Sequence, residues 1–453
     1  MKRAITAIVF ILLTTTAFSD TLPRRAYLGV HLLQVCDSVA TLHNLDKTTG
    51  IRVVQVVEES TAYAIGLKPH DIILKIDGTE VIGVNAFITD IARKSEGDKI
   101  VLEISRQGES ITKQGVVTGF PGETSPHARV IYDQVPFEDG YARTIIHAPH
   151  SPGKHPVFFF IQGGNCASMD NLGDHHAYKK LLEGISERGY VVIKTEKAGI
   201  GDSRSSRNCS DIGFFDEVDL FSASYNALAK HDFIDLENVF VFGHSMGGVQ
   251  APLLDMEFSP RGIMVFGTVA RPWFEYHIEI TRKQRLMLGQ DYLVNEDNHE
   301  RSVRFFYRFM IEKETPEQLL QDPDMADYMR RHFGYTDGGF MHGRHYTFWQ
   351  ELQDTRLFRA WSEVEAYVLA LHGEGEFVAM NPYEPQLIAD IVNHYNPDKA
   401  TFKTVPNVDH GFIYVNDLEH AISVRNNSRY QADNFHYGMV NLLVNWMNKH
   451  LKN

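Results

Sequence analysis

The pattern of hydrophobic and polar residues divides the chain near residue 128. Before that point, short β-rich runs at 27–32, 51–57, 71–76 and 99–104 alternate with turn residues, and one helical pattern lies at 84–92. Short runs bounded by turns predict a small sheet. After that point, continuous apolar runs alternate with helical patterns, which predicts a mostly parallel sheet covered by helices on both faces. The sequence therefore predicts a small β-rich domain followed by a larger α/β domain.

The elements of the larger domain can be placed individually. Two β-like runs, 128–135 and 141–148, flank the turn Glu138-Asp139-Gly140 and predict a hairpin. Residues 118–127 are turn-rich and lack apolar periodicity, so they predict a linker between a module at 26–117 and a domain at 128–453. Further strands are predicted at 157–161, 190–193, 239–242, 262–266, 368–371 and 401–405, with helices at 177–188 and 217–230.

The first nineteen residues are typical of an export signal. Lys2 and Arg3 precede an apolar stretch from 4 to 18, and small residues at 17 and 19 suit cleavage after Ser19. The stretch has 15 residues, fewer than the roughly 18 that span a bilayer, which disfavours the alternative of an uncleaved anchor. The sequence thus predicts a signal peptide at 1–19. The mature protein is expected in the periplasm or outside the cell, without a membrane span.

Length, charge and cysteine content exclude several classes of protein. The chain has 453 residues, and its 44 basic and 58 acidic side chains give a formal net charge of −14. An acidic chain lacks the basic surface that phosphate backbones need, so no nucleic-acid partner is expected. Three cysteines are too few for a disulfide-built scaffold. They allow one bridge and one free thiol in an exported protein.

The small module at 26–117 resembles a PDZ domain. Tyr27, Leu28, Gly29 and Val30 match the carboxylate-binding loop of that family. The resemblance implies that backbone N–H groups of this loop bind the C-terminus of a peptide, which pairs with an exposed strand edge. A module that only packs and binds nothing is the alternative.

Two further segments, 60–71 and 76–81, also match the PDZ family. Thr61 stands where proline is usual in the family, and His70 stands where glycine is usual before the aspartate. Neither departure lies in the carboxylate-binding loop. The expected ligand is therefore still a peptide C-terminus.

A Gly-x-Ser-x-Gly motif centred on Ser245 joins the predicted strand 239–242 to a helical pattern. The motif alone is a weak signal, but the strand–turn–helix context is what a serine nucleophile requires. Such a sharp turn needs small residues beside the serine, and it presents the hydroxyl above the sheet. The backbone N–H of Met246, at the start of the helix, is then placed to donate to an oxyanion.

A serine nucleophile needs a base, and the base needs a group that orients it. Glu374 and Glu376 follow the predicted strand 368–371, and His410 follows the predicted strand 401–405. The resulting order along the chain is serine, acid and histidine, which is the order expected for a Gly-x-Ser-x-Gly hydrolase.

Residues 128–453 resemble an α/β-hydrolase. Besides the segments around Ser245 and His410, the resemblance rests on Gln-Gly-Gly at 162–164 and on the glycine-rich loop 197–203, which ends in Gly-Asp-Ser. It implies that Ser245 is the nucleophile and His410 the general base. It also implies that the backbone N–H groups of Met246 and Gly164 form the oxyanion hole, with Gly163 as the alternative to Gly164.

The acid of the triad is where the chain departs from the family pattern. The usual residue is an aspartate three positions after a glycine, and here Glu376 holds that position. Glutamate has an extra methylene, so its backbone must be slightly retracted. Glu374, Asp409 and other carboxylates are the alternatives.

The segment at about 270–361 is predicted to be a helical insertion, and in this family such an insertion caps the active site. It is rich in aromatic residues. They either line an apolar acyl pocket or form the core of the cap itself.

Near the predicted rim of the site, Cys166 and Cys209 are predicted to form a disulfide in an exported protein. Cys36 is then the odd thiol.

No metal and no cofactor is expected. His175-His176 and His342-x-x-His345 lack the His-Glu-x-x-His or cysteine spacing of a zinc site, so surface or network roles are the simpler interpretation. The glycine-rich loops follow neither dinucleotide-binding nor P-loop spacing.

Together these observations predict an exported serine hydrolase that cleaves a small acyl ester through an acyl-enzyme. A serine peptidase of the same fold, either an aminopeptidase or a prolyl-type enzyme, is one alternative, because a peptide-binding module precedes the hydrolase. A non-catalytic peptide-binding scaffold is the other alternative. The fold alone does not decide between substrates.

Overall fold

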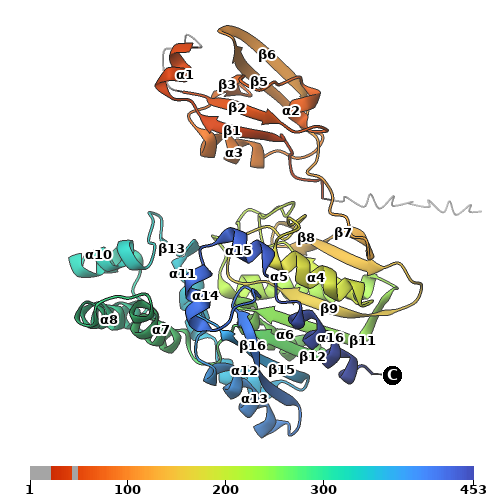
Figure 1. The fold of residues 1–453 in the computed structure, drawn as a ribbon, viewed down its shortest axis with the longest axis vertical. Coiled ribbons are helices and arrows are strands. Elements are labelled where there is room, and N and C mark those ends of the chain that lie inside the picture. The colour runs from red at the N-terminus through yellow and green to blue at the C-terminus, as the bar shows by residue number, and fades with distance from the viewer. Residues whose placement is uncertain (1–21, 43–48, 453) are drawn as a thin grey trace, which may run out of the picture.

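The computed structural model describes residues 22–42 and 49–452, which form two sheet domains (Figure 1). The predicted signal peptide lies outside the described residues. Among the helices described, none has the length and the hydropathy needed to cross a membrane. The chain segments before the first strand and after the last strand of the small domain connect it to the large one.

The small domain contains a sheet in the order β1-β2-β3-β5-β6, with β4 paired to β3. Val53, Ile73, Phe87 and Leu102 are among the buried residues of its core. The bounds are β1 (Val30–Gln34), α1 (Asp37–Leu42), β2 (Ile51–Val56), α2 (Thr61–Ala64), β3 (Ile72–Ile76), β4 (Thr79–Glu80), α3 (Val84–Ala92), β5 (Lys99–Arg106) and β6 (Glu109–Val116).

Strands β1 and β6 are among the elements of the small domain that differ from the prediction. The strand predicted at 27–32 begins only at Val30, because Gly29 adopts a positive φ of 69° that interrupts extended backbone. A β-carbon at Gly29 would also lie 2.2 Å from Cβ of Ser60. Strand β6 was not predicted at all. Its residues alternate between exposed and half-buried, so the strand has no apolar run.

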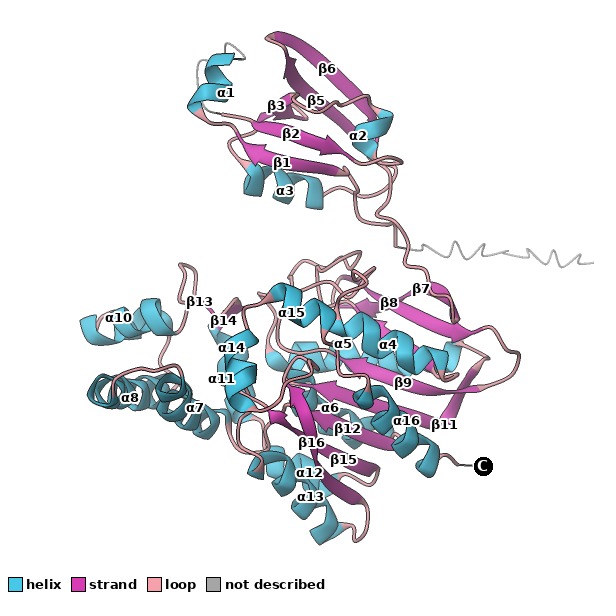
Figure 2. Ribbon diagram, in the orientation of Figure 1, coloured by secondary structure: helices cyan, strands magenta, loops and turns pink. Residues whose placement is uncertain are grey.

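The large domain contains an eight-stranded sheet in the order β16-β15-β12-β11-β9-β10-β8-β7 (Figure 2). The predicted hairpin is β7 and β8, and β8 also pairs antiparallel with β10, while the other neighbours are parallel. The strands are β7 (Ala128–Phe137), β8 (Gly140–Pro149), β9 (His155–Ile161), β10 (Val191–Thr195), β11 (Ile234–His244), β12 (Gly262–Phe266), β15 (Tyr367–Gly375) and β16 (Ala400–Asp409).

Helices cover both faces of this sheet, as the continuous apolar strands require. On strand β9, Val157 and Phe159 belong to the core beneath α5, α6 and α13, whereas Phe158 and Phe160 belong to the core beneath α4 and α16. The helices are α4 (Ala177–Glu187), α5 (Phe214–Asn226), α6 (Met246–Phe258), α13 (Tyr383–Tyr395), α14 (Leu418–Val424), α15 (Ser428–Asp433) and α16 (Gly438–His450), and a 3₁₀-helix spans Ala227–Lys230.

The segment between β12 and β15 is mainly helical, and its helices α7, α8 and α10 lie to one side of the sheet (Figure 2). Its buried aromatic side chains pack mostly on one another; Phe333, for example, contacts Phe305, Phe306 and Phe309. The elements are α7 (Trp273–Met287), α8 (Tyr292–Phe306), a π-helix (Tyr307–Ile311), α9 (Pro316–Leu319), α10 (Pro323–His332), β13 (Phe340–Met341), β14 (Arg344–His345), α11 (Tyr346–Asp354) and α12 (Leu357–Glu363).

The topology explains why distant residues meet. Strands β9, β10, β11, β12, β15 and β16 run parallel, so their carboxyl ends lie at one edge of the sheet. Ligands bind at this edge in open α/β sheets. The residues predicted to carry chemistry all follow the ends of these strands.

Candidate active site

Ser245 occupies the turn between β11 and α6 with a positive φ of 55°. Its backbone N–H donates to the carbonyl oxygen of Phe266 at 2.9 Å. The turn leaves no space for larger neighbours: a β-carbon at Gly243 would lie 2.3 Å from the Gly247 carbonyl oxygen, and one at Gly247 would lie 2.2 Å from that of Ile161. The serine is therefore held in a strained conformation by close packing, as the motif predicted.

His410 and Glu376 form a pair at the ends of β16 and β15, in which the carboxylate is buried and the imidazole is half-buried. Nδ1 of His410 lies 3.0 Å from Oε1 and 2.9 Å from Oε2 of Glu376. The carboxylate also accepts backbone hydrogen bonds from Val378 at 2.8 Å and Ala379 at 2.9 Å. Since a carboxylate only accepts, Nδ1 of His410 carries the proton and Nε2 is left as the basic atom.

Burial and charge act in opposite directions on this pair. Burial works to raise the pKa of Glu376, but the His410 charge and the hydrogen bonds outweigh it and lower that pKa. Burial likewise works to lower the pKa of His410, but the Glu376 carboxylate outweighs it, so the pKa of His410 is raised. The pair therefore favours the charged carboxylate and increases the basicity of the imidazole.

The other carboxylates considered for this position make different contacts. Glu374 is exposed, and its Oε2 accepts from the backbone N–H of Asn407 at 3.4 Å. Oδ1 of Asp409 accepts from the backbone N–H groups of Gly411 and Ile413, both at 2.8 Å. Glu376 is thus the carboxylate that contacts the His410 ring.

His244 and Tyr178 form a hydrogen-bonded pair that contacts the backbone of His410, and neither residue was predicted from the sequence to belong to the site. The hydroxyl of Tyr178 lies 2.6 Å from Nδ1 of His244, and Nε2 of His244 lies 2.8 Å from the His410 carbonyl oxygen. A carbonyl only accepts, so Nε2–H of His244 donates to it, and Nδ1 accepts from the tyrosine. Burial lowers the pKa of His244 to about 3, which keeps this ring neutral. These hydrogen bonds join residues far apart in the sequence, so only the tertiary structure reveals them.

The glycines at 163 and 164 lie against the serine turn. A β-carbon at Gly163 would be 3.4 Å from Cβ of Ser245, and one at Gly164 would be 3.6 Å from Cβ of Met246. Met246 begins helix α6, so its backbone N–H has no carbonyl partner inside the helix. The structure thus brings the two predicted N–H donors, on Met246 and Gly164, next to each other.

A disulfide and a cavity border this region. Cys166 and Cys209 form a disulfide, with Cα atoms 5.7 Å apart and 43 residues between them in sequence. Cys36 is exposed and is a free cysteine. Beside His410 lies a cavity of about 580 Å³, and His175, His176, Arg425 and Gln431 are among the residues that line it.

In the small domain, a groove of about 330 Å³ lies between β1 and α3. Strand β1 is at the edge of its sheet, so its outer backbone groups are open to a further strand. Of the four predicted loop residues, Leu28, Gly29 and Val30 line the groove, whereas Tyr27 packs edge-on against Phe120. The remaining lining residues are His31, Leu32, Val84, Phe87, Ile88 and Ile91.

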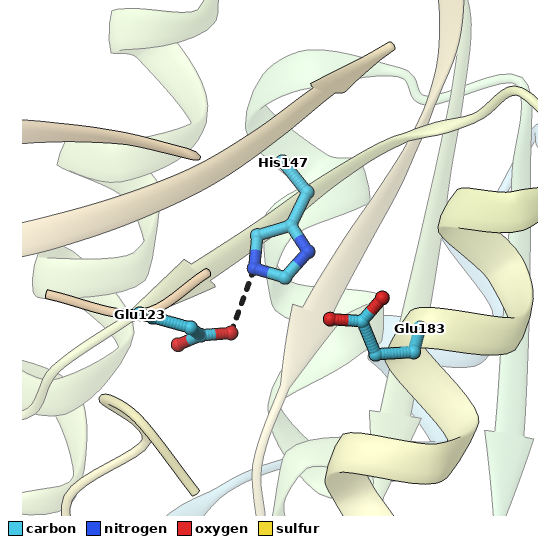
Figure 3. Close-up of side chains that lie close together, drawn as sticks. All are labelled: Glu123, His147 and Glu183. Carbon is cyan, nitrogen blue, oxygen red and sulfur yellow. Dashed lines mark hydrogen bonds and ion pairs between the residues drawn. The ribbon is translucent and has the colours of Figure 1, made fainter. Parts of the chain in front are cut away.

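One group of side chains in the described residues has a composition that could hold a metal ion, and Figure 3 shows its members Glu123, His147 and Glu183. One potential ligand atom from each lies within 4.8 Å of the others. However, Nζ of Lys194 already lies 2.5 Å from Oε2 of Glu123, and Ser125 donates to Glu183 at 2.8 Å. The positively charged ammonium group of Lys194 would repel a metal cation bound at this cluster. We interpret the cluster as an anchor that ties the linker to β8 and α4.

The histidine pairs considered for metal binding make ordinary contacts. Nδ1 of His176 accepts from the backbone N–H of Tyr178 at 3.1 Å and so caps helix α4. The ring of His342 packs edge-on against Phe333, and Nδ1 of His345 lies 2.8 Å from the Thr347 hydroxyl.

Comparison with known proteins divides the chain in the same way. Residues 26–114 match the family model of the PDZ domain, so this segment is a PDZ domain. Two relatives are described as probable periplasmic serine endoproteases, DegP-like. The one from Chlamydia trachomatis is 35% identical over 105 residues, which are 23% of this chain and 21% of the relative. The one from Hahella chejuensis is 30% identical over 124 residues, 25% of this chain and 26% of the relative. The chain thus spans about a quarter or less of these relatives' length.

Solved structures resemble the larger domain at low sequence identity. Est1E from Butyrivibrio proteoclasticus is 13% identical and covers 67% of this chain and 96% of its own, with a TM-score of 0.40. Proline iminopeptidase from Mycobacterium smegmatis is 18% identical and covers 71% of this chain and 98% of its own, with a TM-score of 0.41. The strand order and the strand–turn–helix unit at Ser245 give this domain the α/β-hydrolase fold, which confirms the predicted fold class.

Proposed function

We propose that this protein is an exported serine hydrolase that cleaves carboxylic esters through an acyl-enzyme on Ser245. The observation that carries the proposal is the buried Glu376, which holds the proton of His410 on Nδ1 and leaves Nε2 as a base at the edge where Ser245 lies. A serine in a sharp turn at the same sheet edge as such a base is the arrangement that acyl transfer needs.

In the proposed mechanism, His410 removes the proton of Ser245 while the serine oxygen attacks the substrate carbonyl carbon. The backbone N–H groups of Met246 and Gly164 stabilise the oxyanion that develops. The intermediate collapses as His410 returns the proton to the leaving alcohol. Water, activated by His410, then hydrolyses the acyl-enzyme and releases the acid and Ser245.

The direct test is the Ser245→Ala variant of the mature protein. We expect it to lose labelling by a fluorophosphonate probe and hydrolysis of p-nitrophenyl esters, with an unchanged melting temperature. Ser362→Ala, at the exposed end of α12, is the control and should behave like the wild type. Wild-type ester turnover by Ser245→Ala would show the proposal to be wrong, and a wild-type protein that the probe does not label would favour the non-catalytic scaffold.

A peptidase is the second candidate function, favoured by the open groove of the PDZ domain. The groove offers the free edge of β1 and an apolar wall on α3, which together suit an extended peptide. Aminoacyl and prolyl anilides assayed beside p-nitrophenyl esters distinguish amide from ester cleavage. A kcat/KM for an anilide above that for the best ester would replace the esterase proposal.

We further propose that the PDZ groove binds a peptide C-terminus with apolar side chains. Ile88 on α3 lines the groove and is 55% exposed, so Ile88→Lys should place a charge in the groove without disturbing the core. We expect wild-type protein to bind a peptide with a free carboxylate more tightly than the same peptide amidated at its C-terminus. Calorimetry should show that Ile88→Lys abolishes this preference. Equal binding of both peptides would contradict the proposal.

Export is proposed from the sequence and agrees with the disulfide. Expression with the native leader should yield a protein whose N-terminus is Asp20, as measured by mass spectrometry. A protein that retains residues 1–19 would contradict cleavage after Ser19.

A further inference from the structure

Behind the glycine loop at 163–164 lies a group of three buried charges that the proposed mechanism does not use. Lys197 follows β10, Glu217 lies in α5, and Arg344 lies in β14 of the inserted segment. Their side chains are at most 1% exposed. Nζ of Lys197 lies 2.9 Å from Oε1 of Glu217, and Nη2 of Arg344 lies 2.6 Å from Oε2. One carboxylate thus joins two cations in the interior.

Both cations also bind the backbone of the glycine loop. Nζ of Lys197 donates to the carbonyl oxygen of Gly163 at 2.7 Å. Arg344 donates to the carbonyl oxygen of Gly164 from Nε at 3.2 Å and from Nη2 at 2.9 Å. Its Nη1 donates to the carbonyl of Cys209, which is disulfide-bonded to the nearby Cys166. Hydrogen bonds from charged donors such as these are stronger than those between neutral groups.

These contacts fix the orientation of the peptide groups. In a trans peptide, the carbonyl of one residue and the N–H of the next point in opposite directions. The peptides of the described residues contain no cis bond. When Lys197 holds the Gly163 carbonyl, the N–H of Gly164 must therefore point away from Lys197. Glycine backbone has much conformational freedom, so without such contacts the loop would sample other orientations.

We propose that Lys197 and Arg344 are positioning residues for the N–H of Gly164: Lys197 holds the peptide group that carries this N–H, and Arg344 holds the next peptide group through the Gly164 carbonyl, so that both peptide groups flanking Gly164 are fixed. The inserted segment thereby contributes to catalysis. The inference rests on the proposed function, because an oxyanion forms only if Ser245 attacks a carbonyl. Preorganised donors stabilise the transition state without reorganisation at the moment of reaction. Glu217 compensates the two buried charges, which would otherwise be too costly to bury.

The test compares Arg344→Met and Arg344→Lys with the wild type. Methionine removes all donors to Gly164 and Cys209. Lysine keeps the positive charge opposite Glu217 but lacks the planar guanidinium, whose several N–H groups reach the carbonyl oxygens of both Gly164 and Cys209. We expect kcat to fall on the order of 10-fold to 100-fold in Arg344→Met, with KM nearly unchanged and a smaller loss in Arg344→Lys. Arg304→Met is the control, because Arg304 pairs with Asp324 on the exposed surface of the same insertion.

A pair of inhibitors separates positioning from a merely structural role. A trifluoromethyl ketone forms a tetrahedral oxyanion on the serine, whereas the matching secondary alcohol cannot. We expect the affinity for the ketone to fall by the same factor as kcat/KM, while the affinity for the alcohol stays unchanged. Equal weakening of both inhibitors, or a folded Arg344→Met with wild-type kcat/KM, would overturn the inference.

The positioning role can still be tested if the Arg344→Met variant fails to fold. If Arg344→Met does not fold, Arg344→Lys and Lys197→Met carry the same comparison, and wild-type kinetics in either folded variant would overturn the inference. Activity that survives in Ser245→Ala contradicts the proposed function itself. Ser245→Ala without activity combined with an unaffected Arg344→Met contradicts only the positioning role.

Discussion

At the scale of single residues, Glu376 determines how His410 titrates. Burial of the imidazole favours its neutral form, and the carboxylate at 2.9 Å outweighs that effect. In the proposed mechanism His410 must be unprotonated to accept the serine proton, so we expect activity to fall as pH drops through the pKa of His410. Since that pKa is raised above the ordinary value of 6.5, activity should reach half of its plateau at a pH above 6.5.

Glu376→Gln tests this explanation. The amide removes the charge that favours the imidazolium, so burial then dominates and the acid limb of the kcat/KM profile should shift to lower pH. The plateau should also fall, by about 10⁴-fold if loss of the orienting carboxylate acts as it does in other serine hydrolases. The measurement is a pH profile of ester hydrolysis for both proteins, with Glu374→Gln as the exposed control. An unshifted limb would show that Glu376 does not set the basicity of His410.

Some of these residues could be identified from sequence and others could not. Ser245 and His410 follow predicted strands in short motifs, and Glu376 follows a third strand, so the local sequence pattern identified each of them as a candidate. Arg344 is 180 residues away from Gly164 and belongs to no motif. Its contact depends on where the insertion folds back onto the sheet, and that information is absent from local periodicity. The family pattern favoured Glu376, but strand alternation could not exclude Glu374, because residues two positions apart on a strand point to the same side. Strand β15 ends at Gly375, and the contact of Glu376 with His410 is visible only in the structure.

At the scale of elements, the turn from β11 to α6 depends on Gly247. A β-carbon there would lie 2.2 Å from the carbonyl oxygen of Ile161 on the neighbouring β9. The nearest atoms are all backbone atoms of Ile161 and Gln162, so no side chain can rotate away to relieve the clash. We expect Gly247→Ala to destabilise the protein by about 1–3 kcal/mol, which is the usual cost of overpacking, and to reduce ester hydrolysis by displacing the serine turn. The melting temperature measures the first effect and kcat the second.

Gly173→Ala is the matched control for stability, because a β-carbon at Gly173 meets no atom within 4 Å. Its melting temperature should equal that of the wild type. Equal melting temperatures for both alanine variants would mean that the turn relaxes freely, contrary to the packing argument.

The disulfide joins two loops at the same edge of the sheet. Cys166 follows β9, and Cys209 precedes α5. Closing a loop of 43 residues restricts the unfolded chain and contributes on the order of 4 kcal/mol in the chain-entropy model. We expect the Cys166→Ser, Cys209→Ser double variant to unfold at lower denaturant concentration, and reductant to have the same effect on the wild type only. A reductant effect of equal size on the double variant would assign the loss to another cause.

Elements with a strong apolar pattern could be predicted from the sequence, whereas elements that depend on pairing with a neighbouring strand could not. Helix α3 has the predicted bounds, and strand β12 does as well, because each has a clear amphipathic or apolar pattern. Strand β6 was missed because it lies at the sheet edge with mostly polar residues, so pairing with β5 rather than composition determines it. The fold class followed from the first kind of element.

At the scale of the whole molecule, residues 22–25 connect the two domains although they precede the first strand. Arg24 forms ion pairs with Asp202 and, at 2.7 Å, with Asp170, and its guanidinium lies 4.1 Å from the ring centre of Tyr132. Both aspartates are buried in the large domain. The backbone N–H of Arg25 donates to Asp202 at 2.7 Å. The segment thus holds the PDZ domain at the loop that carries Lys197.

Arg24→Ala should loosen this connection. Tyr132 and Arg143 still contact the aspartates, so we expect at most about 3 kcal/mol of destabilisation, less than for a pair left wholly uncompensated. We also expect a larger radius of gyration by small-angle scattering, because only the contacts of Arg25 would then remain between residues 24–25 and Asp202 or Ser168 of the large domain. Arg93→Ala is the control. Its arginine is 76% exposed and pairs with Asp90 on the surface of α3, so the change should cost less than about 1 kcal/mol and leave the scattering unchanged. If Arg24→Ala matched Arg93→Ala in both measurements, the contacts of Arg25, Arg204 and the linker around Glu123 would be sufficient to hold the two domains together.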